Sequence, residues 1–122
     1  MLVDDHPGFR RVVKILLQNT KAEFVECDDG SDAVRSYATA QPDVVLMDIA
    51  MKGLDGIKAT LRIRTAFPAA RVFILTQYDD PDLRTAAREA GASGYFLKDD
   101  LSQVQTLVRS LTPGTETGES PI

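Results

Sequence analysis

The residues of this chain that could carry chemistry are three aspartates, a threonine and a lysine, each close to the end of a short apolar run. They are Asp4 and Asp5 after Met1–Val3, Asp48 after Val44–Met47, Thr76 after Val72–Leu75, and Lys98 after Tyr95–Leu97. Clustered carboxylates raise one another's pKa unless a cation joins them, and oxygen ligands favour a hard ion such as Mg²⁺. A carboxylate can also attack phosphorus. The set therefore predicts phosphoryl transfer to an aspartate, with the lysine and the threonine contacting the phosphoryl oxygens.

The five apolar runs are predicted strands that would position these side chains. They are Met1–Val3, Ala22–Cys27, Val44–Met47, Val72–Leu75 and Tyr95–Leu97. Segments with helical spacing of apolar residues lie between and after them, so the chain reads as five βα units. This alternation predicts an α/β fold with a doubly wound, five-stranded parallel sheet. In such sheets ligands bind at the carboxyl ends of the strands, where all five side chains would meet if the strand order is the flavodoxin-like 2-1-3-4-5.

Asp-Asp pairs also have a plainer interpretation, because aspartate often caps the start of a helix. The chain has four such pairs, at 4-5, 28-29, 79-80 and 99-100. Pair 28-29 follows an edge strand, and the pairs at 79-80 and 99-100 are interpreted as caps. Only the pair 4-5 directly ends a strand beside the one that precedes Asp48, although Asp5 could double as a cap. The single histidine, His6, is interpreted as a solvated turn residue, and no transition-metal site is predicted.

Composition narrows the class of protein. The 122 residues fit one domain, and the formal net charge of −4 argues against nonspecific binding to nucleic acid or anionic membranes. No apolar run is long enough to span a membrane, and the start lacks a signal-peptide pattern. A lone Cys27 cannot form an internal disulfide, which suits a reducing cytoplasm. Residues 112–122 are rich in Gly, Pro and Thr and are predicted to be a flexible tail or the stump of a linker.

Four motifs together resemble the receiver domain of two-component response regulators. They are Leu2-Val3-Asp4-Asp5-His6, Val45-Leu46-Met47-Asp48-Ile49, Ile74-Leu75-Thr76 and Gly91-Ala92-Ser93-Gly94-Tyr95-Phe96-Leu97-Lys98-Asp99. The Asp-Asp-His start and the Leu-Lys-Asp ending are similar to the NarL/LuxR subfamily. The resemblance covers residues 1–111, which would form the receiver domain.

The resemblance implies a role for each matching residue. Asp48 would accept a phosphoryl group from a phosphohistidine on a sensor kinase. Asp4, Asp5, Asp48 and the backbone carbonyl of Ala50 would hold Mg²⁺. Thr76 and Tyr95 would be the switch residues, and Lys98 would pair with the phosphoryl group. Such a domain is a signalling module rather than an enzyme with a separate substrate. A homodimer could form through the face made by the fourth helix, fifth strand and fifth helix.

The chain also departs from the family's pattern. Lys52 stands where the family usually has proline, which places a positive charge near the site and could alter the loop or the phosphoryl lifetime. Asp99 follows Lys98, so no proline follows that lysine. The subfamily normally continues into a helix-turn-helix domain, so DNA would be contacted only through an output domain absent from this chain.

Three other functions compete with phosphoryl acceptance as interpretations of this sequence. A phosphatase of the haloacid-dehalogenase kind would need a second aspartate two residues after the nucleophile, where this chain has Ala50. A flavodoxin would need a phosphate-binding loop after the first strand, where the acidic Asp4 and Asp5 would repel the flavin phosphate. The third alternative is a receiver-like module that binds partners without being phosphorylated.

Overall fold

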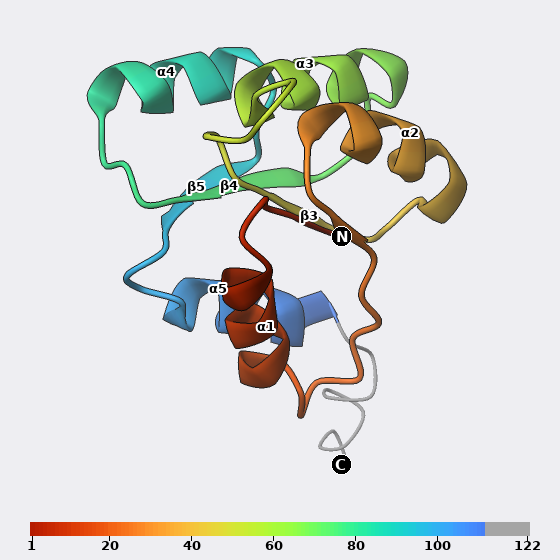
Figure 1. Ribbon diagram of the computed structural model, residues 1–122, viewed down its shortest axis with the longest axis vertical. Helices are drawn as coiled ribbons and strands as arrows, with labels where there is room; N and C mark the ends of the chain where they lie inside the picture. Colours follow the sequence, from red (N-terminus) through yellow and green to blue (C-terminus); the bar gives the residue numbers. More distant parts are fainter. Residues whose placement is uncertain (112–122) are drawn as a thin grey trace.

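The computed structural model describes residues 1–111 and contains a five-stranded parallel sheet with helices on both faces (Figure 1). The strands are β1 Leu2–Val3, β2 Glu26–Cys27, β3 Val45–Met47, β4 Val72–Thr76 and β5 Gly94–Leu97. The helices are α1 Pro7–Leu16, α2 Gly30–Ala40, α3 Gly56–Ala66, α4 Pro81–Glu89 and α5 Ser102–Leu111. The sheet order is β2-β1-β3-β4-β5, which confirms the predicted doubly wound arrangement. The predicted tail, 112–122, lies outside the described residues.

Two apolar layers hold the helices against the sheet. Helices α2, α3 and α4 cover one face, and α1 and α5 cover the other (Figure 1). Successive strand residues point to opposite faces. In β3, Val45 and Met47 therefore join the first layer, while Leu46 joins the second. In β4, Ile74 and Leu75 divide in the same way. A sheet buried on both faces explains why these strands are apolar without interruption.

Most of the predicted helix boundaries are confirmed. Pro7 and Pro81 lie in the first turns of α1 and α4, where a missing backbone N–H costs nothing. Asp80 caps α4 by accepting hydrogen bonds from the backbone of residues 82 and 83. Asp29 caps α2, and Asp100 accepts a hydrogen bond from the first backbone N–H of α5. The idea that Asp5 doubles as a cap is wrong, because the residue before α1 is His6 and its side chain makes no capping bond.

Strand β2 is shorter than predicted. Only Glu26 and Cys27 of the expected Ala22–Cys27 run form a strand, and they pair with Leu2 and Val3 of β1. The residues before Glu26 have no described strand beside them, because β1 begins at Leu2, the partner of Glu26. One further hydrogen bond, 2.8 Å long, runs from the Leu2 N–H to the Val25 carbonyl.

Candidate functional site at the carboxyl end of the sheet

The fold places two buried carboxylates side by side at the carboxyl ends of neighbouring strands. Val3 pairs with Met47 in the register of β1 and β3, so the next residues of the two strands, Asp4 and Asp48, lie together. They are only 5% and 4% exposed. Two carboxylates this deeply buried need hydrogen bonds or an opposite charge, because isolated buried charges are strongly unfavourable.

Lys98 supplies that opposite charge from the end of β5. Its Nζ lies 2.7 Å from Oδ2 of Asp4 and 3.3 Å from Oδ2 of Asp48. The same Nζ lies 4.3 Å from the centre of the Phe9 ring in the first turns of α1, a cation–π contact. The sequence predicted that Lys98 points toward acid, and the structure shows it between two acids. It did not predict Phe9, for which the sequence carries no specific signal.

Backbone N–H groups hold one oxygen of each carboxylate in place. Oδ1 of Asp48 accepts a hydrogen bond from the Ile49 N–H at 2.8 Å, and Oδ1 of Asp4 accepts one from the His6 N–H at 2.8 Å. Gly56, the first residue of α3, packs directly on the Asp48 backbone, and a Cβ there would collide with the Asp48 carbonyl oxygen. Any larger residue would push the loop between β3 and α3 away from the site.

One ammonium, that of Lys98, faces the two buried carboxylates of Asp4 and Asp48, so their negative charge is only partly neutralised. Burial raises the pKa of Asp48, Lys98 lowers it, and the nearby Asp4 raises it again, so the net pKa stands above the ordinary value. The hydrogen bond from the Ile49 N–H also lowers this pKa but does not reverse the direction. A further cation at this position would stabilise the ionised form of Asp48.

Asp5 gives a specific indication of where such a cation fits. Its Oδ1 is buried and accepts no hydrogen bond from the described residues. Asp4, Asp5, His6 and Asp48 each offer one ligand atom, and these atoms all lie within 4.8 Å of one another. Oxygen ligands of this kind suit Mg²⁺, which binds through a few carboxylates and keeps several waters. The donor set therefore fits the predicted metal.

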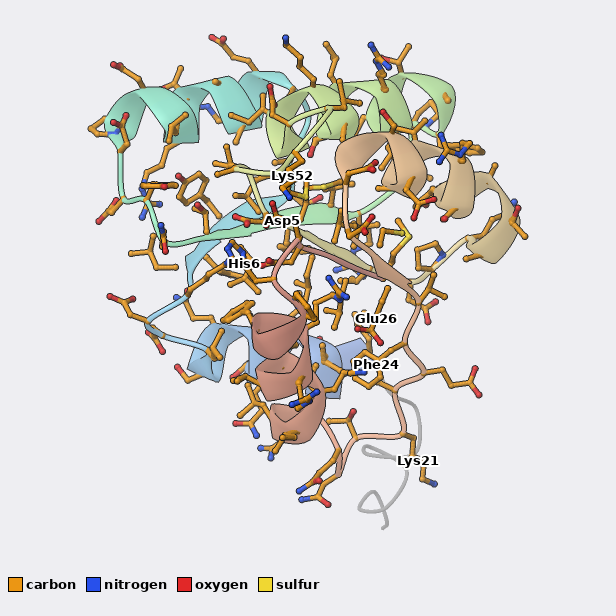
Figure 2. All side chains as sticks on the ribbon, viewed as in Figure 1. Asp5, His6, Lys21, Phe24, Glu26 and Lys52 are labelled. Carbon is orange, nitrogen blue, oxygen red and sulfur yellow. The ribbon has the colours of Figure 1, made fainter. Side chains whose placement is uncertain are left out.

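His6 contacts this cluster in a way that the sequence interpretation missed. Its side chain is 69% exposed, as a turn residue would be, but its Nδ1 lies 3.1 Å from Asp4 Oδ1 and 2.9 Å from Asp5 Oδ1. Figure 2 shows Asp5 and His6 together on the loop between β1 and α1. The available signal was the direct succession Asp-Asp-His at a strand end, which places the ring within reach of both carboxylates.

The two predicted switch residues are linked through the backbone of a third residue. Thr76 is fully buried, and its Oγ1 accepts a hydrogen bond from the Tyr78 N–H at 3.3 Å. The Tyr95 hydroxyl donates to the carbonyl of the same Tyr78 at 2.7 Å. Arg84 lies over the Tyr95 ring at 4.5 Å and pairs with Asp79 at 2.9 Å. Thr76 and Tyr95 thus share one loop, the connection between β4 and α4.

The remaining predicted residues lie on the loop between β3 and α3. Ala50 and Lys52 are both exposed. Figure 2 places Lys52 on this loop, just above Asp5 in that view. The structure brings Asp4, Asp5, Asp48 and Lys98 into one cluster.

A cavity of about 390 Å³ lies elsewhere, lined by the segment that precedes β2, the start of β3 and the end of α5. Lys21 and Phe24, labelled in Figure 2, are among its lining residues. Its lining includes none of the residues in the carboxylate cluster. A second hollow, of only about 10 Å³, does border Asp4 and Asp48. The large cavity and the chemistry therefore lie in different places, and the chemistry identifies the candidate site.

Comparisons with known proteins all indicate one family. The response regulator receiver domain family matches residues 1–109. The transcriptional regulatory protein LiaR of Bacillus subtilis is 34% identical over 125 residues, which cover 100% of this chain and 59% of LiaR. The chain spans about half the length of the curated relatives that it matches.

Solved structures give the same result. A LuxR-family two-component response regulator from Aurantimonas sp. SI85-9A1 is 34% identical with a TM-score of 0.80, and the match covers 96% of this chain and 91% of that one. The BeF3-activated N-terminal receiver domain of Klebsiella pneumoniae RstA is 27% identical with a TM-score of 0.81, covering 91% of this chain and 94% of that one.

Proposed function

Since the chain belongs to the response regulator receiver domain family, we propose that it accepts a phosphoryl group on the carboxylate of Asp48 and thereby switches a partner or an output domain. The observation that carries the proposal is the position of Lys98 between the buried carboxylates of Asp4 and Asp48. A fixed ammonium beside a nucleophilic carboxylate is what a transferring phosphoryl group requires, since its three oxygens carry spread negative charge.

The chemical step is a simple displacement. A carboxylate oxygen of Asp48 attacks the phosphorus of a phosphohistidine on a sensor histidine kinase. The new P–O bond forms as the P–N bond breaks, and the electron pair of that bond stays on the kinase imidazole. Lys98 contacts the transferred oxygens, and the backbone N–H of Ile49 holds the other oxygen of Asp48 in place. Water later cleaves the acyl phosphate, so Asp48 is regenerated and no separate substrate is turned over.

Magnesium would be held by the carboxylates of Asp4, Asp5 and Asp48 together with the backbone carbonyl of Ala50. When bound, it supplies positive charge that neutralises the phosphoryl oxygens. Two observations support this assignment. The buried Oδ1 of Asp5 accepts no hydrogen bond from the described residues, and burial raises the pKa of Asp48, so a cation nearby would stabilise its ionised form.

Phosphorylation would then bias the loop between β4 and α4. The new phosphoryl oxygens are strong acceptors, and the Thr76 hydroxyl is the neighbouring donor. Turning Thr76 toward the phosphoryl group would break its hydrogen bond with the Tyr78 N–H. The carbonyl of the same Tyr78 accepts the hydrogen bond from the Tyr95 hydroxyl, so a movement of Tyr78 would reach Tyr95. Both switch residues would therefore respond together, as a shift between two populated states.

The wider setting follows from the relatives and is also part of the proposal. Response regulator relatives of this chain are transcriptional regulators, so we expect the output to be transcriptional, with DNA contacted by a separate domain. We expect homodimers through the α4–β5–α5 face and a cytoplasmic location. Among the described helices, none has both the length and the apolarity that a membrane crossing requires.

Intact-mass measurement with a small-molecule phosphodonor tests the proposal directly. We expect the wild-type chain to gain one phosphoryl group only when Mg²⁺ is present, and Asp48→Ala to gain none. Asp28→Ala is the matched control, because Asp28 is an exposed aspartate that also follows a strand. It should gain the group like the wild type.

The alternative function, a receiver-shaped module that binds partners without phosphorylation, predicts a different outcome. In that case neither the phosphodonor nor BeF3⁻, which resembles a phosphoryl group in shape and charge, would bind at Asp48. Saturation of the wild-type chain with BeF3⁻ and Mg²⁺, followed by NMR shifts near Thr76 and Tyr95, separates the two functions. The absence of both mass gain and shifts would reject phosphoryl acceptance.

A further inference from the structure

Arg10, in the first turns of α1, connects strand β2 to the turn that carries the candidate metal ligands. Its Nε donates a hydrogen bond to Glu26 Oε1 at 2.9 Å, and its Nη1 donates one to the backbone carbonyl of Asp4. The Arg10 side chain is only 16% exposed. A planar guanidinium has donors along several edges, so it can hold both acceptors at once. Arg10 therefore ties β2 and α1 to the point where β1 ends.

We propose that Arg10, anchored by Glu26, is a positioning residue for the Mg²⁺ site, because it fixes the turn between β1 and α1. This inference rests on the proposed function, which places Mg²⁺ on the carboxylates of the cluster. It deepens that function by assigning a role in metal binding to two charged residues that are not ligands themselves.

The carbonyl that Arg10 contacts belongs to the residue at which the chain leaves the sheet. Asp4 is buried, and its N–H still pairs with the Cys27 carbonyl at 3.0 Å, whereas the next two residues form the turn before α1. A buried carbonyl needs a donor, and here the guanidinium supplies it. Without that donor the peptide group between Asp4 and Asp5 would be free to rotate, and their carboxylates would move with it. Mg²⁺ demands near-octahedral geometry, so such a movement would weaken its binding.

Glu26 keeps the guanidinium in this orientation. It lies on the α1 side of the sheet (Figure 2), and its second carboxylate oxygen accepts a hydrogen bond from Lys14 Nζ at 2.7 Å. The hydrogen bonds from Lys14 and Arg10 lower the pKa of Glu26, so this side chain is a carboxylate at neutral pH. Arg10 and Lys14 thus share one acidic partner, but of the two it is Arg10 that also contacts the turn.

This sharing provides a matched pair of variants, Arg10→Met and Lys14→Met. Each removes one positive charge and one contact with Glu26, but Arg10→Met also removes the donor to the Asp4 carbonyl. The loss of a positive charge near the site would by itself favour Mg²⁺. A lower Mg²⁺ affinity in Arg10→Met would therefore report lost positioning and not the changed charge.

Calorimetric titration with Mg²⁺ measures this difference. We expect Arg10→Met to bind Mg²⁺ about tenfold more weakly than the wild type, as is common when a residue that supports metal ligands is removed. Lys14→Met should stay within about twofold of the wild type, because a largely exposed ion pair contributes little by itself. Glu26→Gln should weaken binding less than Arg10→Met. Added to Arg10→Met, it should cause no further loss, because its effect passes through Arg10.

Amide hydrogen exchange of the metal-free chain separates positioning from general stability. The His6 N–H donates to Asp4 Oδ1 at 2.8 Å, so it should exchange faster in Arg10→Met than in Lys14→Met. Amides of the buried strand β4 should exchange alike in both variants. Equally fast exchange throughout Arg10→Met would show a general loss of stability and would overturn the positioning role.

Equal Mg²⁺ affinities in Arg10→Met and Lys14→Met would also overturn the inference. If the wild type still bound Mg²⁺ and gained a phosphoryl group, the proposed function would stand without it. A wild-type chain that neither bound Mg²⁺ nor gained a phosphoryl group would instead overturn the proposed function. Should Arg10→Met fail to fold, Arg10→Lys replaces it, because one ammonium cannot hold both acceptors as the guanidinium does. A wild-type Mg²⁺ affinity in Arg10→Lys would then contradict the inference.

Discussion

Two of the four Asp-Asp pairs in the chain, Asp4-Asp5 and Asp79-Asp80, do different things although both lie close to the start of a helix. Asp79-Asp80 lies on the surface before α4. There Asp80 caps the helix, and the 63%-exposed side chain of Asp79 pairs with Arg84. Asp4-Asp5 lies before α1. There Asp4 is buried against Lys98, and a buried oxygen of Asp5 accepts no hydrogen bond from the described residues, although His6 Nδ1 lies 2.9 Å from it. Composition is identical, but of these two pairs only Asp4-Asp5 belongs to the acidic cluster with Asp48.

A shift of one residue separates the two arrangements. Asp80 directly precedes Pro81 and occupies the capping position, whereas His6 stands between Asp5 and Pro7 and occupies that position in α1. The side chain of His6 makes no capping bond. Helix α1 therefore lacks a stabilising contribution of about 1 kcal/mol that α4 has. Strained or unsatisfied groups of this kind are typical where carboxylates are kept free for a ligand.

Asp5→Asn should give the largest difference between the two pairs. It removes one charged ligand, so we expect Mg²⁺ affinity to fall about tenfold or more. The free energy of unfolding should change by no more than about 0.5 kcal/mol, because that oxygen accepts no hydrogen bond and its contact with His6 involves an exposed imidazole. Calorimetric titration and urea unfolding at pH 7 measure the two effects.

Asp79→Asn is the control for that variant, since Asp79 is the matching aspartate of the other pair. It should leave Mg²⁺ affinity unchanged. An equal loss of affinity in both variants would show that net charge, and not the site, binds the ion.

Asp80→Ala should have the opposite profile. The Asp80 carboxylate accepts hydrogen bonds from Asp82 N–H at 2.8 Å and Leu83 N–H at 3.2 Å, and truncation leaves both donors to water. We expect the free energy of unfolding to fall by about 1 kcal/mol. Mg²⁺ affinity and phosphoryl gain should remain at the wild-type level. Stability that stayed unchanged would mean that the capping bonds contribute nothing, and the contrast between the pairs would then rest on ligand binding alone.

Much of this comparison could be predicted from the sequence. The apolar runs predicted five strands, because a buried parallel sheet needs uninterrupted apolar strands. Their order was taken from the flavodoxin-like arrangement, and the structure confirms it. The caps at Asp80 and Asp100 followed from the neighbouring helix starts. The grouping of Asp4 with Asp48 followed from the rule that parallel strands end at the same edge. These features depend on local pattern and on topology, both of which one sequence contains.

Other features depend on side-chain geometry across the sheet, which local pattern does not contain. Lys98 contacts Asp4 more closely than Asp48, and its contact with Phe9 crosses from β5 to α1. His6 was interpreted as a solvated turn residue without His or Cys companions, and its side chain is exposed, but the direction of its ring depends on the turn between β1 and α1. The length of β2 was overpredicted because propensity does not say how far the neighbouring strand extends.

Asp48→Asn should give the smallest effect, and its dependence on pH sharpens the comparison. Burial is the main cause of the raised pKa of Asp48, so the fold disfavours its ionised form. A carboxyl group with a raised folded pKa costs no stability below its unfolded value, near 3.8, and its full cost develops above the folded pKa. The neutral amide removes that cost, so we expect the free energy of unfolding to rise by about 0.5 kcal/mol at pH 7.

The same substitution should lose its benefit in acid. At about pH 2.8, well below the unfolded pKa near 3.8, both variants carry an almost entirely neutral group at position 48, so urea unfolding should give nearly equal stabilities. The matched control is Asp28→Asn, because Asp28 is exposed and should show no gain at either pH. A variant that was less stable than the wild type at pH 7 would show that the ion pair of Asp48 with Lys98 outweighs burial. In that case the site would be stabilising in the absence of a ligand, and the contrast with the capping pair at Asp79-Asp80 would disappear.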